Sequence, residues 1–277
     1  MKTILLLTDF SENSINAIRY SLQLFEDDLC NFFVMHVHSS SNYISDDLMH
    51  TSNKSIHHAL IDKYKHRIVK LIVKLKNEFK NDKFNYQILV DYDSLTDAVN
   101  QVIQSKNIDL VVMGTNGVTG AKEVIFGSNT INVIRKVDYP TLVVPEGFSY
   151  TRPEEVLLPL DSADSISESA FIDILKFIQQ FGKKIHLLRV KHTNETSKEA
   201  KKYKDHISYF LKDIDYEYHS IKHVPIHHAV SCYTQTHNIN FTALIVEKES
   251  LFERFFANSK TSKISNRLKT PLLVFHS

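Results

Sequence analysis

The chain has 277 residues, which at about 150 residues per domain indicates two domains of ordinary size or one large one. Its 33 lysines and arginines balance 32 aspartates and glutamates, so no chain-wide charge attracts nucleic acid or an anionic membrane surface. Hydrophobic residues make up 43% of the chain and charged residues 23%, which excludes a disordered or fibrous protein.

The cysteine count and the apolar runs bear on the cellular compartment. Two cysteines, Cys30 and Cys232, are too few and too far apart for a disulfide framework or a four-thiolate zinc site. The apolar run from Ile4 to Leu7 ends at Thr8, whereas the hydrophobic region of a signal peptide needs about 7 residues or more. No stretch approaches the roughly 18 apolar residues of a membrane span. We therefore expect a cytoplasmic protein that binds neither membrane nor nucleic acid.

Apolar runs and amphipathic stripes alternate along the first half of the chain. The runs are short and apolar throughout, as in parallel strands buried on both faces. The stripes have apolar residues three and four positions apart, as on one face of a helix. This alternation predicts a doubly wound parallel sheet. The expected strands are residues 2–8, 32–37, 86–90, 109–113 and 141–144, and the expected helices follow a cap at Ser11 and cover residues 54–83, 95–103 and 129–135.

The same pattern recurs in the second half of the chain. Residues 156–161 resemble residues 4–9, and residues 270–274 resemble residues 139–143. Such self-similarity indicates an internal repeat. The sequence therefore predicts an α/β protein with two tandem doubly wound parallel five-stranded sheets and flanking helices. We expect the domains to cover residues 1–147 and 154–277, with residues 148–153 as the linker.

Glycines cluster in one short window. Four of the six glycines lie there, namely Gly114, Gly117, Gly120 and Gly127. The window follows an expected strand and ends at an expected helix start, where backbone N–H groups suit a phosphate. It contains neither a P-loop nor a G-x-G-x-x-G motif. A phosphate-binding loop is one interpretation, and a plain strand-to-helix loop with Ser128 as the N-cap is the other.

Three motifs together resemble the universal stress protein family. They are Thr8–Glu12 after the first strand, His36-Val37 at the end of the second strand, and Gly114-x2-Gly117-x9-Gly127-Ser128. The resemblance extends through residues 129–134 and 140–145, so it covers the first half and, more weakly, the second. It implies an adenine nucleotide alpha hydrolase-like fold in a tandem two-domain member, with the first half in the ATP-binding branch of the family.

The resemblance also implies a ligand and the residues that hold it. The ligand would be ATP, with ADP or AMP as alternatives and Mg²⁺ as a further candidate. Asp9 and Val37 would hold the base, and Met113 and Gly114 would lie at the ribose side. The remaining site residues would bind the phosphates: Gly117, Gly127, Ser128, Asn129 and Thr130.

The second half lacks the glycines of this loop. Its equivalent stretch is residues 246–250, in which Glu247 and Glu249 put negative charge where phosphates would lie. Asp161 corresponds to Asp9 but is better interpreted as a helix-entry residue. We expect a degenerate domain that covers the first as a pseudo-dimer, so the chain binds one nucleotide. A homodimer of the chain remains open.

A phosphoacceptor role for Asp9, as in receiver domains, is disfavoured. A receiver needs an acidic pair after its first strand and its acceptor after the third strand. Asp91 and Asp93 supply only part of that set.

A histidine metal site is also disfavoured. His219, His223, His227 and His228 lie close together in the sequence, but Pro225 interrupts any helical face that would align them. No cysteine or carboxylate completes a tetrahedral set by its spacing, so we expect no metal site.

The resemblance to the universal stress protein family implies an ATP-binding tandem protein with a regulatory or protective role in the stress response and an unknown protein partner. No nucleophile with a base and no acidic metal cluster stands beside the glycine window, so we assign no catalytic residue and expect slow ATP hydrolysis at most. Two alternatives stay open. One is an ATP-using phosphotransferase or hydrolase with a second substrate between the halves, and the other is a nucleotide-free interaction scaffold.

Overall fold

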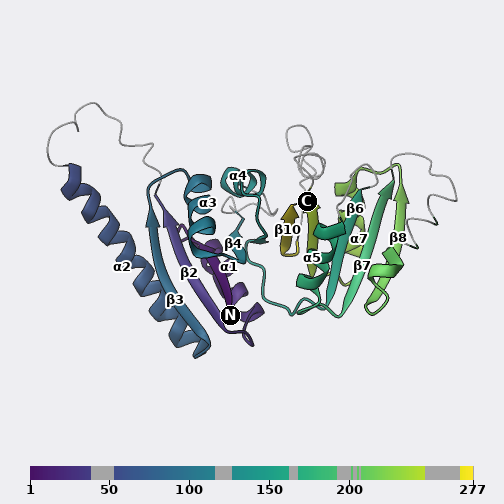
Figure 1. Cartoon of the computed structure of the whole chain (residues 1–277), viewed down its shortest axis with the longest axis horizontal. Coiled ribbons are helices and arrows are strands. Elements are labelled where there is room, and N and C mark those ends of the chain that lie inside the picture. Colours follow the sequence, from purple (N-terminus) through teal and green to yellow (C-terminus); the bar gives the residue numbers. More distant parts are fainter. Residues whose placement is uncertain are drawn as a thin grey trace. The chain divides into compact units, whose positions relative to one another are not determined.

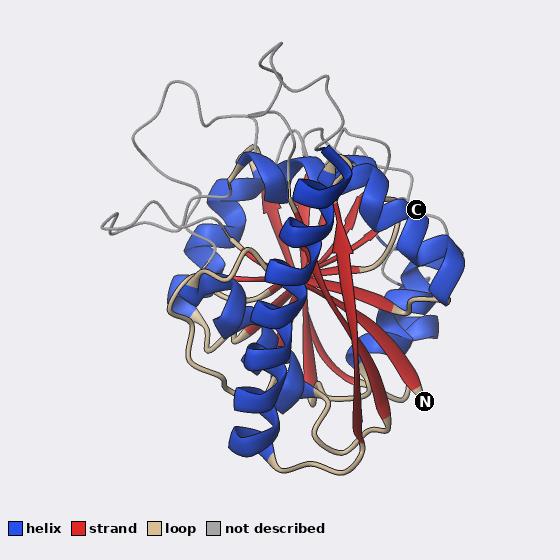
Figure 2. Ribbon diagram, turned by 90° about the vertical axis from the view of Figure 1, so that its left-hand side faces the viewer, coloured by secondary structure: helices blue, strands red, loops and turns tan. Residues whose placement is uncertain are grey.

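The computed structural model describes residues 1–38, 53–115, 127–161, 168–191, 201, 205, 207–246 and 269–276. Contacts divide these residues into two compact units, residues 1–115 with 127–137 and residues 138–276. Helices flank the strands of the molecule, as expected for a doubly wound α/β fold (Figure 2).

The first unit holds a parallel sheet with the strand order β3-β2-β1-β4. Its strands agree with the predicted ones to within two residues at each end. They are β1 (Lys2–Leu7), β2 (Cys30–Val37), β3 (Phe84–Asp91) and β4 (Leu110–Gly114), and the helices are α1 (Glu12–Leu24), α2 (Asn53–Phe79), α3 (Leu95–Lys106) and α4 (Ser128–Lys136) (Figure 1).

Strand β1 and helix α1 show why the sequence folds this way. Leu5 and Leu6 of β1 are fully buried, because β1 is an inner strand with neighbours on both sides. Helix α1 begins after Ser11, whose Oγ accepts a hydrogen bond from the Ser14 N–H at 3.2 Å. The predicted cap is thereby confirmed, and it satisfies one of the free N–H groups of the first turn.

Helix α2 packs on β2 and β3 through the predicted apolar stripe. Ile68, Leu71 and Leu75 of this stripe are buried. Among the helices that the structure describes, none combines the length and the apolar character needed to cross a membrane.

The second unit repeats the topology of the first. Its strands have the order β5-β10-β9-β6-β7-β8, and β8-β7-β6-β9 reproduces the order β3-β2-β1-β4. The internal repeat is therefore a repeat of topology as well as of sequence. The elements are β5 (Thr141–Val144), β6 (Glu155–Asp161), α5 (Glu168–Ile178), β7 (Lys184–Lys191), β8 (Asp215–Lys222), α7 (Ile226–Thr236), β9 (Phe241–Val246) and β10 (Leu272–His276).

Strand β5 departs from the wholly parallel arrangement that we predicted. It pairs with β10 in antiparallel fashion, with Leu142 opposite Leu273. The two are the equivalent closing strands of the two repeats, and all four residues of β5 are buried. Pairing gives each strand a hydrogen-bonded neighbour on a side that would otherwise be an open edge.

Candidate functional site

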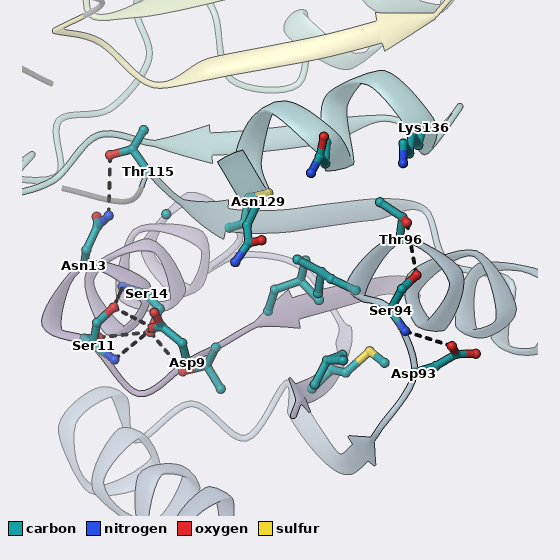
Figure 3. A pocket seen from close by; sticks show the side chains of 18 residues that line it. Asp9, Ser11, Asn13, Ser14, Asp93, Ser94, Thr96, Thr115, Asn129 and Lys136 are labelled. Carbon is teal, nitrogen blue, oxygen red and sulfur yellow. Dashed lines mark hydrogen bonds between the residues drawn. The ribbon is translucent and has the colours of Figure 1, made fainter. Parts of the chain in front are cut away.

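A cavity of about 360 Å³ opens in the first unit at the carboxyl ends of its strands. Ligands bind at this edge in open α/β sheets, and the volume lies in the range of small-molecule sites. Figure 3 shows side chains that reach it from the end of β1, the start of α3 and the start of α4. The lining residues are Leu7, Thr8, Asp9, Ser11, Asn13, Ser14, Met35, Val37, Asp93, Ser94, Leu95, Thr96, Met113, Gly114, Thr115, Asn129, Asn132 and Lys136.

Five of the predicted site residues line this one cavity. Asp9 follows β1, Val37 ends β2, Met113 and Gly114 end β4, and Asn129 lies in the first turn of α4. They are far apart in the sequence, and the parallel sheet brings them together because its strands end at the same edge.

The other predicted residues are not among the described residues that line the cavity. Thr130 is fully buried, and its hydroxyl donates a hydrogen bond to the Gly114 carbonyl oxygen at 3.3 Å. Gly127 is the N-cap of α4 and Ser128 is its first residue, so the structure does not place Ser128 at the cap. Gly117 lies outside the described residues. The roles of all four toward a ligand stay predictions.

Asp9 stands on a short, hydrogen-bonded turn. Its Oδ1 accepts bonds from the backbone N–H of Ser11 at 2.9 Å and from the Ser11 hydroxyl at 2.6 Å. Partial burial raises the pKa of Asp9, but the hydrogen bonds from Ser11 outweigh it and hold that pKa below its usual value. The side chain is therefore a carboxylate at neutral pH, with one oxygen engaged by the turn.

An aromatic cluster of Phe10, His36 and Tyr64 packs against this turn. Phe10 has a φ of 67° and packs on His36 with ring centroids 4.8 Å apart, while the guanidinium of Arg67 lies 3.9 Å from the Phe10 centroid. The His36 ring also lies 4.4 Å from Tyr64 of α2, and its Nδ1 donates to the Thr8 carbonyl oxygen at 2.8 Å. Burial lowers the pKa of His36, so the ring is neutral at physiological pH. His36 thus supports the turn and does not face the cavity.

The start of α3 forms another wall of the cavity, which the sequence analysis missed. Ser94 is the N-cap of α3, and its Oγ accepts a bond from the Asp97 N–H at 3.3 Å. Asp93 accepts a bond from the Ser94 N–H at 2.8 Å. These residues directly follow β3. The rule that ligands bind at the carboxyl ends of parallel strands would therefore have pointed to them.

The start of α4 differs from these capped helices. Its N-cap, Gly127, has φ −67° and ψ 162°, and no side chain caps the helix through a hydrogen bond there. The first N–H groups of α4 thus lack a side-chain acceptor at the N-cap, and they carry the positive end of the helix dipole. This arrangement suits an anionic group of a ligand.

Asn13 contributes an unsatisfied acceptor to the cavity. Its Nδ2 donates weakly to the Thr115 hydroxyl at 3.4 Å, whereas its Oδ1 is buried and has no hydrogen-bond partner among the described residues. A buried polar atom without a partner costs stability, so a ligand donor at this point would be favourable. Nothing in the sequence singled out Asn13, because its position depends on how α1 packs on β4.

Comparison with known proteins identifies the family. The model of the universal stress protein family matches residues 1–145, more than half of the chain. The chain belongs to the universal stress protein family. The resemblance drawn from the three motifs is thus confirmed, and the matched residues include those that line the cavity.

Solved structures resemble the chain in fold over its whole length. A universal stress protein of Archaeoglobus fulgidus has a similar structure, with a TM-score of 0.66 and 16% identity over 99% of this chain and 96% of that one. A Pseudomonas aeruginosa structure follows with a TM-score of 0.59 and 11% identity over 100% of this chain and 93% of that one. These likenesses concern the fold alone. A curated universal stress protein of Methanocaldococcus jannaschii is 30% identical over 70 residues, 25% of this chain and 43% of that protein.

Proposed function

We propose that the first unit binds ATP in the cavity and that the tandem protein acts as a nucleotide-responsive regulatory or protective protein in the stress response. The observation that carries the proposal is the convergence of Asp9, Val37, Met113, Gly114 and Asn129 on one cavity in a universal stress protein fold. The cytoplasm remains the expected compartment.

The chemistry of the lining supports a nucleoside. Leu7, Met35 and Val37 offer an apolar wall against which a base can lie. The Asp9 carboxylate has one oxygen free of the Ser11 bonds, and it would accept a hydrogen bond from the amino group of adenine. The unsatisfied Oδ1 of Asn13 would accept a second bond from the ligand.

The start of α4 supports the phosphate end. Gly127 and Ser128 would present backbone N–H groups, and Thr130 would fix the end of β4 through its bond to Gly114. Gly117, which lies outside the described residues, stays a predicted phosphate ligand. Mg²⁺ would enter with the triphosphate, and ADP or AMP would occupy the same pocket.

The second half is proposed to be a degenerate domain without a nucleotide, covering residues 154–277 after a linker at 148–153. Asp161 ends β6 and is only 2% exposed, which suits a structural role. The expectation that this half binds no nucleotide rests on Glu247 and Glu249, which lie outside the described residues. A pseudo-dimer of the halves and a homodimer of the chain are both compatible with this proposal.

Mass spectrometry of the nucleotide released by denaturing natively purified protein tests the proposal. An adenine nucleotide near one equivalent per chain is expected. For stripped protein, ATP at about 100 times its dissociation constant should add about 2.7 kcal/mol to the free energy of unfolding. No released nucleotide together with an unchanged Tm in saturating ATP and Mg²⁺ would favour the interaction scaffold. Rapid ATP turnover would favour the phosphotransferase or hydrolase.

A further inference from the structure

Figure 1 labels the strands β7 and β8 and the helix α7 of the second unit. Metal-ligand-type side chains from these elements form a cluster. Glu217 and His219 are two residues apart in β8, so their side chains lie on the same face of the sheet. His186 of β7 is the register partner of Glu217. His237 joins them from the C-cap of α7, where the negative end of the helix dipole favours a cation.

Three of these residues offer ligand atoms close to one another. One atom each from Glu217, His219 and His237 lie within 4.8 Å of one another, and all three residues are half-buried. The closest described pair is His219 Nε2 and Glu217 Oε2 at 3.2 Å. Ligands at the usual zinc distances of about 2.0–2.2 Å stand roughly 3.3 Å apart, so a side-chain shift of about an ångström closes the set.

Neighbouring groups orient the ligands as outer partners do in metal sites. His237 Nδ1 lies 3.1 Å from the Tyr233 carbonyl oxygen and 2.9 Å from the Thr236 hydroxyl; a proton on Nδ1, donated to that carbonyl, leaves the lone pair on Nε2. The Tyr233 ring stacks on His237 with centroids 3.8 Å apart, which fixes its plane. Glu217 Oε1 accepts from Lys184 Nζ at 2.5 Å, whereas Oε2 is hydrogen-bonded to His219 Nε2 at 3.2 Å and is the oxygen that an ion would take over. Second-shell bonds of this kind hold ligands in the tautomer and direction that a metal needs.

His186 adds a further group without joining the set. Its Nδ1 bonds to the Tyr233 hydroxyl at 2.9 Å and lies 3.7 Å from Glu217 Oε2, while its Nε2 pairs with Glu155. Both ring nitrogens are thus occupied, and His186 supports Glu217 and Tyr233 from the sheet side. Three protein ligands remain, which is the number that leaves a fourth tetrahedral position open.

We propose that Glu217, His219 and His237 bind one Zn²⁺ ion, with the fourth position open to water or to a ligand from solution. Two imidazoles and one carboxylate are a donor set that zinc prefers, and hard ions such as Mg²⁺ favour all-oxygen sites. The sequence analysis considered His219 with His223, His227 and His228 and expected no metal. The fold instead pairs His219 with a carboxylate on its own strand and with a histidine 18 positions later.

The competing account is a hydrogen-bond network, in which His219 Nε2 donates to Glu217 Oε2 and no ion binds. The two accounts differ in the role of His237. It has no carboxylate partner among the described salt bridges, so the network without an ion gives it no role, whereas in the zinc site it is a ligand.

Zinc titration of the chelator-treated, full-length chain separates the two accounts. We expect one tight Zn²⁺ site per chain in the wild type, and at least tenfold weaker binding in H237A and in E217Q. The matched control is H228A, which removes an exposed histidine of the same helix and should leave the affinity unchanged. Wild-type affinity in both cluster variants, or the same loss in the control, would overturn the proposal.

Cobalt replacement gives a reading that does not depend on variant folding. Wild-type protein with one equivalent of Co²⁺ should show the intense visible absorption of a four-coordinate ion, and Zn²⁺ should displace it. The weak absorption of octahedral Co²⁺ at that stoichiometry would contradict the site.

Discussion

Gly114 lies directly against Asn13, because a Cβ at position 114 would stand 2.9 Å from the backbone oxygen of Asn13 and 2.9 Å from its Oδ1. The end of β4 and the start of α1 therefore approach more closely than any residue with a side chain allows. Both residues line the cavity, so this contact fixes how closely β4 and α1 approach each other at the cavity wall.

Replacing Gly114 by alanine should reduce both stability and nucleotide binding. The added methyl group meets a backbone atom, so α1 must move, and such overpacking costs about 1–3 kcal/mol. Urea denaturation monitored by circular dichroism measures this cost, and an ATP titration measures the second effect. A variant with wild-type stability would show that α1 and β4 are not in such close contact.

Replacing Gly127 by valine should abolish nucleotide binding but leave stability nearly unchanged. Its φ of −67° and ψ of 162° are an extended conformation that any residue adopts, so G127V should fold with little loss of stability. Binding of ATP should be lost, because the valine side chain occupies the space in which the phosphate meets the backbone. Isothermal titration of both glycine variants distinguishes the effects. Unchanged ATP affinity in G127V would place the phosphates elsewhere.

Asp9 should contribute to ATP binding through its charge and through the oxygen that Ser11 does not engage. D9A removes the acceptor, and a hydrogen bond to a charged group is worth about 1.5–3 kcal/mol, which corresponds to roughly 10- to 150-fold in affinity. The matched control is D93N, which neutralises another carboxylate of the same cavity. Equal losses in D9A and D93N would point to a general electrostatic effect and not to a specific contact.

The strands and most of the first site follow from the sequence for identifiable reasons. Asp9, Val37 and Met113 stand where runs of apolar residues end in the sequence, which marks the ends of strands. A parallel sheet places these strand ends at one edge, so the three residues are expected to lie close together. Asn13 and Lys136 were missed because their approach to the cavity depends on helix packing. The antiparallel pairing of β5 was missed because a four-residue apolar strand reads the same in either direction. His237 comes close to Glu217 and His219 only through the placement of α7, which no local spacing encodes.

Buried His36 should make stability depend on pH. The pKa of His36 in the folded state lies below the usual value of about 6.5. Near and below that pH, the unfolded chain therefore binds more protons at His36 than the folded chain does. The free energy of unfolding should therefore fall as the pH drops from 7 toward 5. H36N, which keeps a neutral donor near the Thr8 carbonyl oxygen, should show a shallower slope than the wild type. The exposed control H228N should not. Identical slopes for H36N and the wild type would remove His36 as the cause.

Calorimetric titration of nucleotide-free, full-length protein with ATP and Mg²⁺ tests the central claim most directly, because it counts the sites. We predict one site per chain, since the second half has Glu247 and Glu249 where the first has the glycine loop. Two lost backbone contacts at about 1.5 kcal/mol each would already weaken a second site more than a hundredfold. The double variant G117V/G127V should show no binding. Two equivalent sites, or wild-type affinity in the double variant, would contradict a single ATP site in the first unit.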